Sequence, residues 1–290
     1  MNIEGKRLLL RVDLNVPLDG GQVADDSRIR AVLPTIHYAL DNGSKLIIVS
    51  HLNRPGGKVD PRYSLAPVCE RLSSLLGAPV RFIPQVRGEE VRAAVDKMAP
   101  GTAVMLENVR FDPGEESNEE GFAKDLASLA DVYIDDAFAD AHRSHASNVG
   151  VTALVPDSGG GFLMRREMTT LGKALESPQR PLVVVVGGAK VKSKMGVIEH
   201  LSRKADRILL GGVMALPFLM AQGRFAGRHG TITTASSTYR RPSSRPRPST
   251  RASRAVSTRD GTTCGWARSG RWPSGASRPR PYATIGSTSA

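Results

Sequence analysis

The sequence contains only two cysteines, Cys69 and Cys264, and it has no long apolar stretch. Two cysteines far apart in the chain suggest neither a disulfide framework nor a cysteine-based metal site, and they are typical of a reducing cytoplasm. The densest apolar runs, such as residues 183–186, have the length of a strand, so we expect no signal peptide and no membrane partner. These patterns predict a cytoplasmic protein.

Residues 231–290 lack Lys, Glu, Leu, Met and Phe but contain 11 Arg. They therefore carry most of the net charge of +12, and the nearly neutral remainder has no cationic surface that would indicate nucleic-acid binding. Ser and Thr supply 22 residues of the same segment. Such a composition cannot bury enough apolar area to offset about 1–2 kcal/mol of backbone entropy per residue. We therefore predict that residues 226–290 are disordered.

The preceding residues repeat one unit, in which a short apolar run is followed by a loop and a stretch with helical periodicity. Runs this apolar indicate strands of a parallel sheet that is covered on both faces. We predict strands at 8–12, 46–49, 80–83, 103–106, 132–134, 182–186 and 208–210. We predict helices near 27–43, 65–76, 89–98, 118–129 and 164–175.

These elements predict an α/β fold in four parts. Residues 1–163 would form a three-layer, Rossmann-like substrate-binding domain with a parallel sheet. Residues 164–180 are predicted to be a hinge helix, because prolines follow its periodic stretch. Residues 181–225 begin a second α/β domain that is incomplete, and the disordered tail at 226–290 follows it.

Polar loops follow four of the predicted strands, and ligands of open parallel sheets bind at the carboxyl ends of strands. An isolated Arg or His in a loop is more often solvated than functional. Here, however, basic residues recur at the strand ends, and Arg side chains match phosphate oxygens bidentately. The sequence therefore predicts a site for a small phosphorylated substrate, with the basic candidates His51, Arg54, Arg110 and Arg143.

A second candidate site follows the apolar run at 183–186, where Gly187 and Gly188 precede a lysine-rich helix start. Glycines let a backbone approach a ligand closely, and a helix N-terminus offers free N–H groups to a phosphate. The spacing is not that of a Walker A loop, which has four residues between its first Gly and Gly-Lys-Ser/Thr. A Gly-Gly turn by itself is more often only a tight turn.

Two other chemistries are less well supported. A metal site is the alternative for one polar segment, but its spacing matches no closed zinc pattern and suits an anion pocket or local hydrogen bonds equally well. The residues concerned are Asp135, Asp136, Asp140, His142 and His145. A Ser/His/Asp hydrolase is not indicated, because the sequence has no Gly-x-Ser-x-Gly elbow. We assign no metal ligands.

Six segments in chain order strongly resemble the motifs of phosphoglycerate kinase. They are residues 11–17, 26–30, 50–55, 107–111, 136–147 and 187–194. The resemblance covers residues 1 to about 225, and six motifs in the same order make coincidence implausible. It implies transfer of a phosphoryl group between the acyl phosphate of 1,3-bisphosphoglycerate and ADP, with Mg²⁺, in glycolysis.

The resemblance also gives roles to residues of the first domain. Asp13 and Asn15 would hold the hydroxyl and carboxylate end of the substrate, and Arg28 would meet the transferring phosphoryl group. An Arg at that place suits a reaction that depends on positioning and on stabilising developing charge. The remote phosphate of the substrate would be held by His51, Arg54, Arg110 and Arg143.

In the second domain, the resemblance implies that the lysines bind nucleotide phosphates and that the glycines shape their loop. The residues are Gly187, Gly188, Lys190 and Lys194, of which Lys194 joins Arg28 as a catalytic candidate. The family's Gly-Gly-Gly-Asp-Thr motif, which contacts nucleotide phosphates and metal, is absent from the sequence. We therefore expect a chain that binds 3-phosphoglycerate, binds ADP or ATP weakly if at all, and is severely impaired in catalysis. We also expect it to be a monomer.

Several positions depart from the family pattern. Asn53 stands where Gly is usual, and Ala139-Asp140 replaces the common Gly-Thr or Gly-Ala, which adds a carboxylate near the anion site. Val213 and Leu216-Pro217 also depart from the usual sequence of their segment. The effect of Asn53 and Asp140 on substrate binding is open at this point.

The tail has three alternative explanations. An Arg-rich segment without Lys, beginning inside a domain, is typical of GC-rich DNA translated in a shifted reading frame. In the second alternative, the tail is a genuine extension and the chain is a non-catalytic protein that binds a phosphorylated metabolite. The tail would then bind nucleic acid through phosphates and through stacking by Tyr239, Trp266, Trp272 and Tyr282. In the third alternative, another chain supplies the missing half of the second domain.

The shifted-frame hypothesis makes a prediction about the parent DNA. Translation of the two other frames beyond Gly223 is expected to give a Gly-Gly-Gly-Asp-Thr segment. If neither frame continues the family pattern, the shifted-frame hypothesis is wrong.

Overall fold

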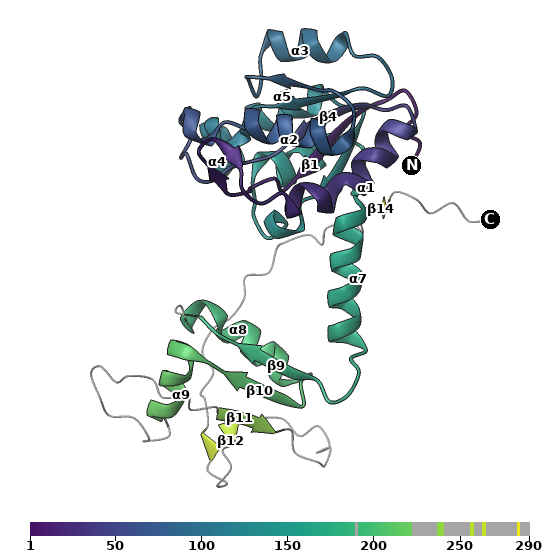
Figure 1. Cartoon of the computed structure of the whole chain (residues 1–290). Helices are drawn as coiled ribbons and strands as arrows, with labels where there is room; N and C mark the ends of the chain where they lie inside the picture. The colour runs from purple at the N-terminus through teal and green to yellow at the C-terminus, as the bar shows by residue number, and fades with distance from the viewer. Residues whose placement is uncertain (189–190, 222–236, 241–255, 258–262, 265–282, 285–290) are drawn as a thin grey trace, which may run out of the picture. The chain divides into compact units, whose positions relative to one another are not determined.

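The computed structural model describes residues 1–188 and 191–221 and four short strands further along the chain. The chain forms two compact units. Unit 1 comprises Met1–Thr169 and Pro279–Ala290, and unit 2 comprises Thr170–Arg278. Helix α7 (Phe162–Glu176) contains the boundary between the two units, which lies between Thr169 and Thr170 (Figure 1).

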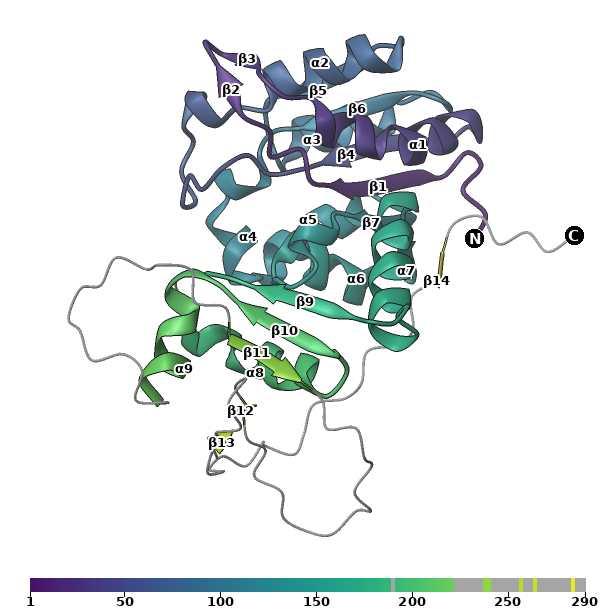
Figure 2. The same cartoon turned by 60° about the horizontal axis from the view of Figure 1, so that its bottom comes forward.

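Unit 1 is built on a parallel sheet with the strand order β14-β8-β7-β1-β4-β6-β5. Figure 2 labels β1, β4, β5, β6 and β7 of this sheet. The strands are β1 (Arg7–Val12), β4 (Lys45–Val49), β5 (Val80–Ile83), β6 (Ala103–Leu106), β7 (Val132–Asp136), β8 (Asp157–Gly160) and β14 (Ala283–Thr284). Five of them confirm the predicted strands. Strand β8 was not predicted, because its sequence Asp-Ser-Gly-Gly contains no apolar run.

Helices cover both faces of this sheet, which confirms the three-layer prediction. The helices of unit 1 before α7 are α1 (Ser27–Asp41), α2 (Ala66–Leu76), α3 (Glu89–Asp96), α4 (Pro113–Ser117), α5 (Glu120–Ser128) and α6 (Val151–Leu154). In β1, Leu8 and Leu10 pack in a core with α1 and α2, whereas Leu9 packs on the other face with α3 and α5. No helix in the described parts of the chain is both long and apolar enough to cross a membrane.

Helix α1 shows how the apolar pattern determines these elements. Ile29, Val32 and Ile36 recur at helical spacing and are fully buried against the sheet. Pro34 lies on the exposed side of the helix, and the helix continues past it. The burial of the apolar stripe therefore outweighs the local cost of the proline.

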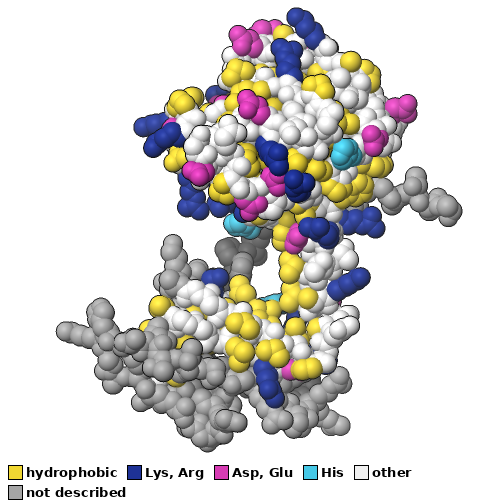
Figure 3. Space-filling model, in the orientation of Figure 1, with side chains coloured by type: hydrophobic (Ala, Val, Ile, Leu, Met, Phe, Trp, Pro, Cys, Tyr) yellow, Lys and Arg dark blue, Asp and Glu magenta, His cyan; other side chains and the backbone are white. Residues whose placement is uncertain are grey.

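Short elements complete the loops of unit 1. They are the hairpin β2 (Leu18–Asp19) and β3 (Gln22–Val23), the 3-10 helices η1 (Pro61–Tyr63), η2 (Val109–Phe111) and η3 (Phe138–Asp140), and the π-helical turn η4 (Ala146–Gly150). Two of these elements, η2 and η3, follow the carboxyl ends of strands β6 and β7. Basic and acidic side chains are interspersed on the visible face of this unit (Figure 3).

Unit 2 contains a smaller sheet with the order β11-β10-β9, in which β9 (Val183–Val186) and β10 (Arg207–Leu210) are parallel and β11 (Ser237–Arg240) is antiparallel. Strands β9 and β10 confirm the strands predicted at 182–186 and 208–210. Helices α8 (Val191–Ser202) and α9 (Leu216–Ala221) and the 3-10 helix η5 (Gly212–Ala215) accompany them. Val185 is 73% exposed, so this sheet is less completely covered than that of unit 1.

Most of residues 226–290 lies outside the described residues, and the predicted disorder of this range stays a prediction. The described parts of the range are four strands, namely β11, β14, β12 (Val256–Ser257) and β13 (Thr263–Cys264). Strands β12 and β13 pair antiparallel with each other. Trp266, Trp272 and Tyr282 lie outside the described residues.

The core assignment of unit 1 gives a stability prediction. Leu10→Ala removes a fully buried side chain from the central strand β1, and it is expected to lower the free energy of unfolding by about 2–5 kcal/mol. The matched control is Val59→Ala, whose side chain is 76% exposed and whose effect is expected to stay within about 0.5 kcal/mol. Urea unfolding followed by circular dichroism measures both. Equal effects of the two substitutions would contradict the core assignment.

Candidate active site

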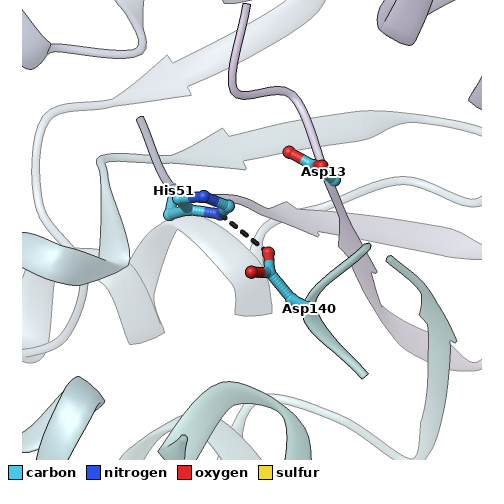
Figure 4. Close-up of side chains that lie close together, drawn as sticks. All are labelled: Asp13, His51 and Asp140. Atoms are coloured by element: carbon cyan, nitrogen blue, oxygen red, sulfur yellow. Dashed lines mark ion pairs between the residues drawn. The ribbon is translucent and has the colours of Figure 1, made fainter. Parts of the chain in front are cut away.

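The candidate site of unit 1 lies at the carboxyl ends of β1, β4, β6 and β7, which are neighbours in the sheet. Asp13 follows β1, His51 follows β4, Arg110 lies in η2 after β6, and Asp140 ends η3 after β7. Figure 4 shows the side chains of Asp13, His51 and Asp140 close together. The parallel sheet thus brings together residues from four loops, as the sequence pattern predicts.

Asp140 lies at the centre of these residues and is only 5% exposed. One carboxylate oxygen, Oδ2, accepts a hydrogen bond from Arg11 Nη2 at 3.2 Å and lies 3.1 Å from His51 Nδ1. The other, Oδ1, accepts from Arg143 Nε at 3.1 Å and lies 3.8 Å from Arg110 Nη2. We refer to Arg11, His51, Arg110 and Arg143 as the basic cluster.

The charges in this group shift one another's titration. Burial lowers the pKa of His51 and the charge of Arg11 lowers it further, which together outweigh the hydrogen bond with Asp140, so the imidazole is neutral at neutral pH. For Asp140, burial alone would raise the pKa. The hydrogen bond with His51 and the charges of Arg11 and Arg110 outweigh that effect and hold the pKa well below its usual range. Asp140 is therefore a carboxylate at neutral pH.

Arg11 is also linked by hydrogen bonds to a second set of polar residues. Its side chain is 1% exposed, and its Nε donates to Ser147 Oγ at 2.9 Å. Ser147 Oγ in turn donates to the fully buried Glu115 at 2.6 Å. Sequence reasoning missed both Arg11 and Glu115 as site residues. The available signal was a single Arg inside the apolar run Leu8–Val12, because a charge in a buried strand requires partners.

Arg110 combines deep burial with unused hydrogen-bonding capacity. It is 2% exposed, and its Nη1 donates to the carbonyl oxygen of Asn53 at 2.7 Å. Its Nε and Nη2 are buried and make no hydrogen bond within the described residues, although Glu116 Oε1 lies 3.3 Å from Nε. Buried donors without a hydrogen bond are costly, and they favour the arrival of an acceptor.

Two further candidates lie beside this group. Arg28, in the first turn of α1, donates from Nη1 to Asp13 Oδ2, and its side chain is half exposed. Asn15 Oδ1 accepts from the backbone N of Asn53 at 2.9 Å. Asn53 has φ = 55°, a left-handed conformation that Gly and Asn adopt most easily, which explains why Asn can replace Gly here.

Arg54 does not belong to the basic cluster. Its side chain is exposed, and among the residues that the structure describes it forms no ion pair. The prediction that Arg54 holds a phosphate therefore has less structural support than the predictions for His51, Arg110 and Arg143.

The nucleotide candidates all belong to unit 2. Gly188 follows β9 with φ = 137°, a conformation that L side chains rarely adopt. A Cβ atom on Gly188 would lie 3.3 Å from Lys194 Cε, so the stem of this lysine runs beside the loop that contains Gly187. Lys194 itself is exposed. Lys190 lies outside the described residues.

The arrangement in unit 1 suits an anion better than a metal ion. Asp13, His51 and Asp140 each offer one ligand atom, all within 4.8 Å of one another. However, the two carboxylates are already paired with Arg28 and with members of the basic cluster, and a cation would meet that positive charge. Of the residues in the alternative metal group, only Asp140 belongs to this trio.

A pocket of about 540 Å³ lies elsewhere in unit 1. Its lining residues include Gln22, Asp25, Asp26, Glu70 and Arg71. Asp26 forms ion pairs there with Arg30 and Arg71. The pocket contains none of the residues predicted for the site, so it is not the place where the strand-end loops converge.

The chain is similar to known phosphoglycerate kinases over most of its length. A family model for phosphoglycerate kinase matches residues 1–241. The chain is 51% identical over 227 residues to phosphoglycerate kinase from Fervidobacterium nodosum, covering 78% of this chain and 56% of that protein. For the enzyme from Moorella thermoacetica, the identity is 51% over 228 residues, covering 79% and 58%.

Solved structures give the same result. The fold resembles phosphoglycerate kinase from Coxiella burnetii with a TM-score of 0.69 and 42% identity, covering 79% of this chain and 57% of that one. The enzyme from Pyrococcus horikoshii matches with a TM-score of 0.69 and 36% identity, covering 79% and 58%. The chain thus spans little more than half the length of the relatives it matches. From the family match and these similarities together, we conclude that the chain belongs to the phosphoglycerate kinase family.

Proposed function

We propose that this chain binds 3-phosphoglycerate, or the corresponding part of 1,3-bisphosphoglycerate, at the strand-end site of unit 1. The observation that carries the proposal is Arg110, a buried guanidinium whose Nε and Nη2 make no hydrogen bond within the described residues. Arg143 and His51 lie with it around Asp140. Guanidinium groups placed in this way suit the oxygens of a phosphate, since charge-assisted hydrogen bonds are the stronger ones.

The remaining residues fit the other end of a three-carbon acid. Asp13 and Asn15 follow β1 and present hydrogen-bonding groups for the hydroxyl and carboxylate of the substrate. Arg28 is fixed to Asp13 by an ion pair, and its half-exposed side chain remains accessible to a transferring phosphoryl group. Arg54 would join the remote phosphate from its exposed loop. Arg28 thus acts on the reacting group while the basic cluster positions the substrate.

The proposal extends to the nucleotide only in part. Gly187, Gly188 and Lys194 would contact the phosphates of ADP or ATP, and Mg²⁺ bound with the nucleotide would neutralise charge on the transferring group. The conformation of Gly188 and the lysine stem beside it fit a phosphate loop. However, the 290 residues contain no Gly-Gly-Gly-Asp-Thr segment. We therefore propose that this chain binds nucleotide weakly and transfers phosphoryl groups poorly.

The substrate proposal is tested by the loss of Arg110. Arg110→Gln is expected to weaken binding of 3-phosphoglycerate by at least about tenfold, because a hydrogen bond to a charged group contributes about 1.5–3 kcal/mol. The matched control is Arg92→Gln, which removes a half-exposed Arg that pairs with Asp125 away from the site. Isothermal titration calorimetry measures both. Unchanged binding in Arg110→Gln would contradict the proposed site.

The proposal for catalysis is tested by turnover. With 3-phosphoglycerate and MgATP, the chain is expected to turn over at least about 100-fold more slowly than a full-length relative, because poor positioning of the reacting groups alone costs that much. The Fervidobacterium nodosum enzyme, assayed in parallel, serves as the reference. Turnover equal to the reference would show that the chain does not need the missing motif.

A further inference from the structure

The carboxylate of Asp140 faces all four side chains of the basic cluster. Its two oxygens lie within 3.1–3.8 Å of a nitrogen of each member of the basic cluster. Its carboxylate is buried and ionised. The position thus holds a permanent anion among the basic side chains that the proposed function places at the substrate's phosphate.

We propose that the carboxylate of Asp140 is a built-in counter-ion that competes with the phosphate of the substrate for the basic cluster and lowers the affinity of this chain for phosphorylated ligands. This inference rests on the proposed function, because it concerns the same site. It assigns Asp140 as a residue that weakens binding, rather than as one that contacts the substrate productively.

Asp140 cannot easily move away to make room for a phosphate. Its backbone N donates to the carbonyl oxygen of Ala137 at 2.9 Å, and its own carbonyl oxygen accepts from Arg143 N at 2.9 Å and from Asn148 Nδ2 at 3.1 Å. The side chain is short and nearly enclosed. An arriving phosphate would therefore share the cations with a fixed negative charge and would be repelled by it.

The opposite role, in which Asp140 helps binding by holding the basic side chains in place, is less well supported. Arg11 is anchored independently by Ser147, and Arg110 is anchored by the carbonyl oxygen of Asn53. Both arginines therefore keep a partner when Asp140 loses its charge. Arg110 also keeps Nε and Nη2 available for a new acceptor.

The test is to neutralise Asp140 and to measure anion binding. Asp140→Asn keeps the size of the side chain, and Asp140→Thr introduces a residue common in the family at this position. Isothermal titration calorimetry with inorganic phosphate and with 3-phosphoglycerate is expected to show binding about tenfold tighter than in the parent chain, a change of about 1.4 kcal/mol. The control Asp125→Asn removes the same charge at a partly exposed ion pair with Arg92, and it is expected to leave both affinities unchanged.

Thermal unfolding gives a second readout, which also detects variants that have lost their fold. Without phosphate, Asp140→Asn is expected to have a lower Tm than the parent chain, because the basic cluster loses its counter-ion. Phosphate is then expected to raise the Tm of the variant more than that of the parent, since a ligand at a given concentration stabilises the folded state more when it binds more tightly.

The outcomes separate this inference from the proposed function. The counter-ion role is overturned if both variants bind both ligands no more tightly than the parent and if phosphate raises their Tm no further. If the parent binds 3-phosphoglycerate and the variants bind it no more tightly, the proposed function stands without that role. If the variants gain affinity for inorganic phosphate but no form of the chain binds 3-phosphoglycerate, the counter-ion role stands and the proposed function fails.

Discussion

The parallel pairing of four neighbouring strands in unit 1 determines where the candidate site of this chain lies. Strand β1 pairs with β4 and β7, and β4 pairs with β6, so the loops after all four strands meet at one edge of the sheet. Asp13, His51, Arg110 and Asp140 are separated by up to 127 residues in the sequence, yet they belong to one site. Burial of apolar residues on both faces keeps this sheet in place and thereby fixes the site.

Burial also determines which charges at the strand ends have to be balanced. Buried charged groups are costly unless they are paired, and Arg11, Arg110 and Asp140 are all nearly enclosed. Arg11 has compensation from Asp140 and, through Ser147, from Glu115. Arg110 is less well satisfied, because its Nε and Nη2 make no hydrogen bond within the described residues. A metal ion in the same place would add to the positive charge instead of balancing it.

Much of the fold of unit 1 could be predicted from its apolar runs, because strands buried on both faces are continuously apolar. The Asp-Ser-Gly-Gly sequence of β8 has no such run, and it is a strand only because it pairs with β7. The helix α1 was predicted in spite of Pro34, and the structure confirms it.

The site was less accessible to sequence reasoning than the fold. Spacing after strands identified His51, Arg110 and Arg143, but it could not separate them from Arg54, because exposure depends on how each loop folds back. Arg11 was overlooked, since it lies within a strand and not after one. The carboxylate of Asp140 was recognised as unusual, whereas its position among four basic side chains depends on contacts between loops that no local pattern contains.

In the function that we propose, the basic cluster at the strand ends receives the phosphate of a three-carbon acid. The most direct measurement is a crystal structure of this chain with 3-phosphoglycerate bound. We expect the phosphate oxygens to lie within hydrogen-bonding distance of Arg110 Nε or Nη2, with the carboxylate end toward Asp13 and Asn15. A ligand bound elsewhere, for example in the pocket that contains Asp26 and Arg71, with Arg110 unchanged, would contradict the claim.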